Sequence, residues 1–131
     1  EQLLTGPWQA AAWYKRPPKQ YKLNPGQLRP VLTGYEGGDK VACIASDRIT
    51  VDGLPVGYLF REQPLDPNAP DSGWRIFAGD EDADYMADAA HFEFYHLNTI
   101  CNYDASILEL LNAPAPVAFR RAGDGWQQEE R

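Results

Sequence analysis

The sequence predicts an α+β fold: a single compact domain in which short helices pack on a mostly antiparallel β-sheet. Short apolar runs typical of strands alternate along the chain with short segments that carry helix-start residues, and this pattern favours one sheet layer covered by one helix layer. The chain has 131 residues, a length at which one domain buries enough surface to fold unaided. It contains no internal repeat or low-complexity tract.

The chain divides into an N-terminal arm (residues 1–22), the domain itself (23–126) and a C-terminal tail (127–131). The arm includes the stretch WYKRPPKQYK, which mixes aromatic and basic residues as some single-stranded nucleic-acid sites do. Pro17 and Pro18 interrupt this patch, and the rest of the chain is acidic. We therefore expect the arm to pack on the domain.

A short helical turn is predicted after Asn24, because Asn is a good N-cap and Pro25 occupies a favoured first position. The glycine-rich stretch GYEGGDK that follows lacks the Gly-Lys-Ser/Thr ending of a phosphate-binding loop. We interpret it as a turn.

The clearest strand pattern lies in VACIASDRITVDGLPVGYLFRE. Apolar runs at 41–45 and 49–51 precede Asp52-Gly53, a typical hairpin turn, and another run follows at 55–61. This pattern predicts the central hairpin of the domain. The proline-rich EQPLDPNAPDS then predicts an exposed loop.

The segment GWRIFAG predicts the next strand. Alternation places Trp74 and Ile76 on one face, and Arg75 and Phe77 on the other. The acids that follow this strand stand where a short helix begins, and negative charge is favourable there because of the helix dipole.

The last third of the chain predicts two more strands and two short helices. HFEFYH places Phe92, Phe94 and His96 on one strand face. A short helix is expected from Asn98, and Asp104 is a good N-cap for ASILELLN, which carries an apolar stripe. VAFRR predicts the last strand, and GDGWQQEER predicts a turn and the tail.

The charge of the chain disfavours some classes of partner. The net charge is −7 and the isoelectric point is about 4.7. Residues 1–40 hold six Lys and Arg against three acids, whereas residues 41–131 hold six against sixteen. Nucleic acid and anionic membrane surfaces are disfavoured, since phosphates are bound by concentrated positive charge. No apolar run approaches the roughly 20 residues that span a bilayer. A basic protein is the favoured partner.

Metal-binding and catalytic motifs are incomplete. A stretch starting at Asp80 has some acids of an EF-hand loop, but Tyr85 replaces the required glycine and His91 the required glutamate. His91 and His96 are five residues apart, which suits neither a helical zinc pair nor one strand face. We expect a protein that is not an enzyme and has no catalytic, metal-binding or cofactor-binding residues.

The two cysteines leave alternatives open. Cys43 and Cys101 belong to no CxxC pattern. They are either buried free thiols or a single disulfide formed in an oxidising compartment. An enzyme that pairs Cys101 with His96 is a further alternative, and it predicts both side chains together in a cleft.

The acidic field is the main functional feature. Residues Glu62 to Glu93 include nine acids and one cation, Arg75, and such a field steers a basic protein toward it while aromatic side chains supply affinity. The predicted contact patch consists of Trp74, Asp80, Glu81, Asp82, Asp84 and Tyr85. Two alternatives remain: the acids confer only solubility, or these residues cap a helix and fill the core.

Several segments together resemble a known family. ACIASDRITVDGLPVGYLFRE, DSGWRIFAGDEDADYM and LNTICNYDASILELLNAPAPVAFRR are similar to the immunity protein 33 family of small bacterial proteins, over about residues 23–126. The first twenty or so residues lie outside this pattern, and Ala78 stands where serine is frequent in the family.

The resemblance implies a non-enzymatic immunity protein that neutralises one cognate toxin or effector of a polymorphic or type VI secretion system. Combined with the charge, it predicts occlusion of the toxin's active site through the acidic surface. The alternative is a small ligand-binding or regulatory domain without a toxin partner. We expect the cytoplasm as the compartment, with the periplasm as the alternative. The sequence leaves the toxin and the oligomeric state open.

Overall fold

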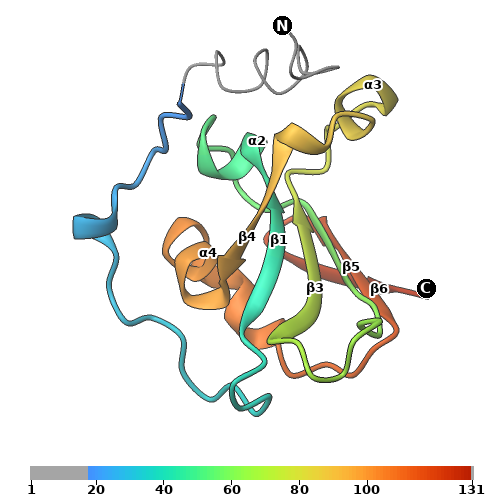
Figure 1. The fold of residues 1–131 in the computed structure, drawn as a ribbon. Coiled ribbons are helices and arrows are strands. Elements are labelled where there is room, and N and C mark those ends of the chain that lie inside the picture. Colours follow the sequence, from blue (N-terminus) through green and yellow to red (C-terminus); the bar gives the residue numbers. More distant parts are fainter. Residues whose placement is uncertain (1–17, 131) are drawn as a thin grey trace, which may run out of the picture.

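The computed structural model describes residues 18–130, and its centre is one six-stranded sheet (Figure 1). The strand order is β4-β1-β3-β2-β5-β6; β1 and β3 run parallel, and the other neighbours are antiparallel. The strands are β1 (Ala42–Ser46), β2 (Tyr58–Arg61), β3 (Asp71–Phe77), β4 (Phe92–His96), β5 (Val117–Ala122) and β6 (Gly125–Glu129). The sheet and its short helices confirm the predicted α+β class.

The helices are all short. They are α2 (Asp47–Thr50), α3 (Ala83–Met86) and α4 (Leu97–Tyr103), with 3-10 turns η1 (Pro25–Gln27), η2 (Ala89–His91) and η3 (Ala105–Leu110). Asp104 caps η3 as predicted, because its side chain accepts a hydrogen bond from the Ser106 backbone nitrogen. Within residues 18–130, no helix has the length and apolar character needed to cross a bilayer.

The predicted hairpin between 41 and 61 is wrong. The Ser46 side chain accepts a hydrogen bond from the Arg48 nitrogen and so starts α2 where a second strand was expected. Gly53, at φ +80°, takes part in the turn that follows. β1 and β2 consequently do not pair, because β3 lies between them.

The predicted C-terminal tail is also wrong over most of its length. Residues Gly125–Glu129 form β6, which pairs with β5 through a turn containing Gly123 at φ +60°. The Trp126 ring lies under the Arg121 guanidinium at 3.9 Å, and its Nε1 donates to the Ser106 carbonyl. These contacts make β6 part of the domain.

Residues 18–22 of the predicted arm contact the domain, whereas residues 1–17 lie outside the described part. Lys19 Nζ is 3.0 Å from Asp47 Oδ1 and 2.8 Å from Glu93 Oε2. The Lys22 nitrogen donates to the Thr50 carbonyl.

The core lies between one sheet face and the helices α4 and η3 (Figure 1). Strands contribute side chains such as Cys43, Leu59 and Ile76, and the helices contribute Ile100 and Ile107, all fully buried. The chain from residue 28 to 36 then crosses α4 on the outside, held by three asparagine side chains. They are Asn98, Asn102 and Asn112. On this face the helices cover the sheet, and the segment 28–36 in turn covers α4.

Candidate functional site

The opposite face of the sheet carries an apolar groove of about 450 Å³. Strand register sets its floor, since Ile44 is opposite both Phe94 of β4 and Arg75 of β3, and Phe60 of β2 is opposite Arg75. Alternation directs these side chains away from the core face. We call this feature the open-face groove; it is lined by Ile44, Phe60, Glu62, Arg75, Phe77, Met86, Ala89, Phe92, Glu93 and Phe94.

Aromatic rings pack against one another in the floor of the groove. Phe60 and Phe77 are stacked with centroids 5.8 Å apart, and Phe92 meets Phe77 edge-on at 6.0 Å. At the rim, Phe94 is 65% exposed and Met86 is 46% exposed. A stacked floor with exposed apolar rims can take an apolar side chain from another molecule without rearrangement.

The cation inside the groove is already neutralised. Arg75 is only 8% exposed, donates to both carboxylate oxygens of Asp71 at 2.8 Å and donates to Glu62 Oε2 at 2.8 Å. The Arg75 hydrogen bonds lower the pKa of Asp71, and the same bonds raise the pKa of Arg75. The Arg75 guanidinium is therefore held in one position in the floor of the groove by these charged hydrogen bonds.

The acidic segment 79–88 reaches this face through Met86, which lines the open-face groove. Glu81 and Met86 border a smaller hollow with Tyr58, Phe60 and Arg120, which adjoins the open-face groove through shared residues. Figure 1 shows α3 beyond the end of the sheet at which β4 begins.

Most of the predicted acids have structural contacts. Arg48 Nε donates to Asp80 Oδ1 at 3.1 Å, and this pairing lowers the pKa of Asp80. Glu81 accepts hydrogen bonds from the Ala78 and Gly79 nitrogens, both at 2.9 Å. Asp82 caps α3 by accepting from the Tyr85 nitrogen at 2.8 Å. The capping alternative thus describes Asp82, whereas Asp80 forms an ion pair and Glu81 binds the backbone at the end of β3.

The other three residues of the predicted contact patch differ in burial. Asp84 is exposed in the first turn of α3. Tyr85 is partly buried, stacks on His91 at 3.9 Å, and burial raises its pKa. Trp74 is fully buried on the other side of the sheet, where Nε1 donates to the Leu111 carbonyl. The prediction that Trp74 contacts a partner is therefore wrong.

The predicted contact patch contains none of the apolar residues that line the groove. Phe92 and Phe94 do share a strand face, as alternation predicts. This face is uncovered because α4 and η3 pack on the other one, and no local pattern reports on which face the connecting helices pack.

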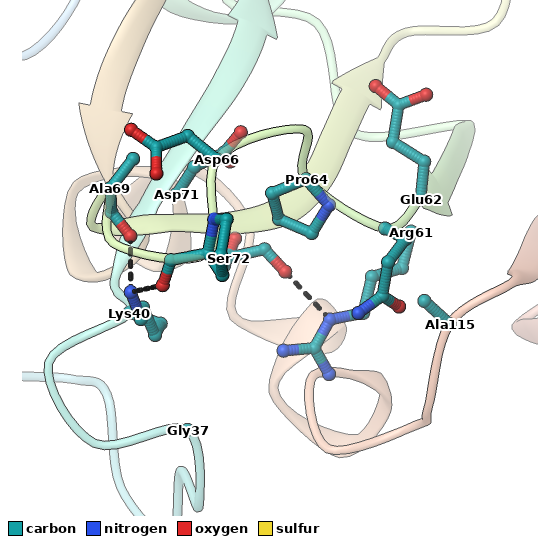
Figure 2. Close-up of a pocket in the computed structure, with 12 residues that line it drawn as sticks. Gly37, Lys40, Arg61, Glu62, Pro64, Asp66, Ala69, Asp71, Ser72 and Ala115 are labelled. Carbon is teal, nitrogen blue, oxygen red and sulfur yellow. Dashed lines mark hydrogen bonds between the residues drawn. The ribbon is translucent and has the colours of Figure 1, made fainter.

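A second hollow, of about 270 Å³, lies under the loop between β2 and β3 (Figure 2). Lys40 Nζ donates to the Pro67 and Ala69 carbonyls at 2.5 and 2.6 Å, and Arg61 Nε donates to the Ser72 carbonyl at 2.9 Å. Lys40 and Arg61 thus hold the backbone of the β2–β3 loop in place, and we interpret their role at this hollow as structural.

The described residues give no support to a cysteine enzyme. Cys43 and Cys101 are buried free thiols, and burial raises the pKa of Cys101 to about 11. His96 is exposed and caps α4 by accepting from the Asn98 nitrogen. Residues 18–130 contain no cluster of three or more His, Cys, Asp or Glu side chains that suits a metal ion.

Comparison with known proteins gives one match. The family model described as "Immunity protein Imm33 domain" matches residues 43–130, beginning later than the resemblance in the sequence indicated and including β6. No curated protein and no solved structure matches the chain. Because the matched segment covers more than half of the sequence and confirms the resemblance, the chain belongs to the Imm33 family of immunity protein domains.

Proposed function

We propose that this protein binds a cognate bacterial toxin and neutralises it by covering the toxin's active site. The observation that carries the proposal is the family match, which spans most of the sheet and the whole acidic segment. An immunity protein of this kind inhibits by occupancy, so it needs no chemistry of its own.

The charge distribution supports a basic partner. Residues 79–88 contain five acids and no Lys or Arg. A negative field of this kind raises the rate of encounter with a positively charged protein and disfavours wrong partners. A stable inhibitory complex buries roughly 1,600 Å² in total, so the contact must extend beyond the acidic segment itself.

We further propose that the toxin is an effector of a polymorphic or type VI secretion system and that protection takes place in the cytoplasm. Two buried free thiols are consistent with a reducing compartment. Cell fractionation tests the compartment, and recovery from the periplasm would contradict it.

The test of the function uses the product of the reading frame next to this gene. We expect that product to arrest growth when it is expressed alone, to be tolerated when this protein is co-expressed, and to co-purify with it. An unrelated acidic protein of similar size, expressed at the same level, controls for nonspecific charge effects. A harmless neighbour, or a toxic one that this protein neither binds nor counteracts, would contradict the proposal.

A small ligand-binding or regulatory domain is the second candidate. The open-face groove, at about 450 Å³, falls within the usual range of small-molecule sites. Ligands that bind the folded state raise the melting temperature by mass action. A thermal-shift screen of metals and small metabolites tests this candidate, which fails if none of them raises the melting temperature.

A further inference from the structure

Exposed apolar side chains concentrate at the open-face groove. Among residues 18–130, the large hydrophobic side chains with high exposure are Tyr21, Leu65, Met86 and Phe94. Tyr21 is engaged with Glu93 through a 2.6 Å hydrogen bond, and Leu65 lies in the loop between β2 and β3. The other two border the same groove. A clustered apolar rim of this kind is typical of an interaction site, unlike scattered single residues.

The groove is preorganised for binding. Its floor consists of stacked rings, and its guanidinium is held by carboxylates on β3 and in the residue after β2. Rigid aromatic anchors in a central, desolvated pocket carry most of the affinity in protein interfaces. Little conformational entropy is therefore lost when a partner docks here.

Charge around the groove specifies the chemistry of the occupant. Segment 79–88 reaches the groove through Met86 and holds five acids, of which Asp80 is paired with Arg48. Glu81 borders the adjoining hollow together with Arg120, which is paired with Glu129. Glu62 lines the groove, with a side chain 47% exposed. A nucleic acid or an anionic membrane is repelled by this rim, and so is a second copy of the chain that presents the same acids.

We infer that the open-face groove is the docking surface for the toxin, and that the toxin inserts an apolar side chain there from a segment that also carries basic residues. The inference rests on the proposed function and deepens it. The apolar side chain fills the space between Phe94, Phe77 and Met86, and the basic residues meet the acids of segment 79–88.

Matched variants test this docking surface. Phe94→Glu and Met86→Glu place a charge at the rim from two different elements, β4 and α3. Leu65→Glu makes a similar change at a fully exposed site (103%) that does not line the groove. Affinity for the purified neighbouring gene product is measured by calorimetry, and folding is checked by circular dichroism and melting temperature.

We expect both groove variants to remain folded and to lose affinity by about 30-fold or more, the effect of a residue that carries binding energy. Leu65→Glu is expected to bind like the wild type. If the wild type binds but the groove variants bind equally well, the docking surface is wrong and the proposed function stands. If the wild type does not bind the neighbouring gene product, both the docking surface and the proposed function are contradicted.

Analytical ultracentrifugation of the free protein tests whether a second copy of the chain occupies the groove, because it measures the oligomeric state. A wild-type dimer that Phe94→Glu converts to a monomer would show that a second copy covers the groove, and this would overturn the inference. A monomeric wild type, together with the affinity loss above, supports a toxin docked on this face.

Discussion

Trp74 acts as a structural anchor. Its ring is fully buried, stacks near Phe119 at 6.3 Å and lies 5.5 Å from the Arg61 guanidinium. Trp74→Ala should lower the free energy of unfolding by about 4 kcal/mol, through lost transfer energy and a cavity. That cost is a large part of the total stability of a domain. Chemical denaturation followed by circular dichroism measures it; a stable variant with impaired binding would contradict the assignment.

The Asp71 and Arg75 pair predicts a pH dependence. Arg75 holds the pKa of Asp71 below its ordinary value of 3.8. A carboxylate with a lowered folded-state pKa stabilises the fold fully above its unfolded pKa, and that stabilisation is lost as pH falls through the folded pKa. Asp71→Asn should therefore cost about 2 kcal/mol at pH 7, as expected for lost charged hydrogen bonds.

Urea unfolding at pH 7 and at pH 3 compares this variant with the wild type. The difference in unfolding free energy should be largest at pH 7 and shrink in acid, because below the unfolded pKa the unfolded chain binds a proton that folding must release. A difference that stays constant with pH would show that the pair contributes no charge-dependent stability.

Single residues were predictable where the cause is local. The alternation of Trp74 and Ile76 against Arg75 and Phe77, and the cap at Asp104, follow from strand and helix geometry alone. The sequence predicts Trp74 as an aromatic anchor of the acidic contact patch and leaves a position in the core as the alternative. Nothing local to that segment reports the partner of its Nε1, the Leu111 carbonyl, which is 37 residues away.

At the level of elements, β3 contains a bulge that depends on glycine. Opposite β1, the register shifts between Ala42 and Ile44, and Gly73 sits in the bulge at φ +90°. An added Cβ would lie 2.1 Å from the Glu62 carbonyl oxygen. Gly73→Ala should therefore cost about 2 kcal/mol or more, from backbone strain and a clash that must be relieved. Thermal unfolding checks this.

Gly125→Ala is the matched control, since no atom lies within 4 Å of its added Cβ and its φ is not positive. It should leave the melting temperature nearly unchanged or raise it slightly. Equal changes in melting temperature for the two substitutions would show that the bulge does not require glycine at position 73.

The sequence predicts which segments form strands or helices more reliably than it predicts which strands pair. The Asp-Gly turn and its flanking apolar runs resemble a hairpin, but Ser46 starts a helix before the turn is reached. β6 has a polar sequence, GWQQE, and it is ordered by pairing with β5 and by Trp126 packing. The first error arises because a local helix cap interrupts the apolar pattern, and the second because long-range pairing overrides local preference.

At the level of the whole molecule, the acidic field predicts how fast the partner associates. Asp84 is exposed in α3, the helix that also carries Met86 of the groove, and Asp124 is exposed in the turn between β5 and β6. Asp84→Lys and Asp124→Lys change the net charge equally. Asp84→Lys should slow association more, by a factor of about 2 to 3, as expected for the loss of an exposed charge contact.

Stopped-flow or surface-based kinetics with the toxin at low and moderate salt measure these rates. The gap between the two variants should narrow as salt screens the field. Equal slowing by both variants would show that only total charge matters and that the field is not local to the groove.

The α+β class and the family were predictable from sequence because they depend on local patterns and on several motifs in fixed order. The set of residues that line the open-face groove was not, because it requires the strand order. β3 separates β1 from β2, and that order brings Ile44, Arg75 and Phe60 side by side in the sheet.

The most direct test of the account is a growth assay with the neighbouring gene product expressed alone, with wild-type protein, and with Phe94→Glu or Leu65→Glu at matched levels. We predict that wild type and Leu65→Glu restore growth and that folded Phe94→Glu does not. Failure of the wild type to restore growth against a toxic neighbour would contradict the account.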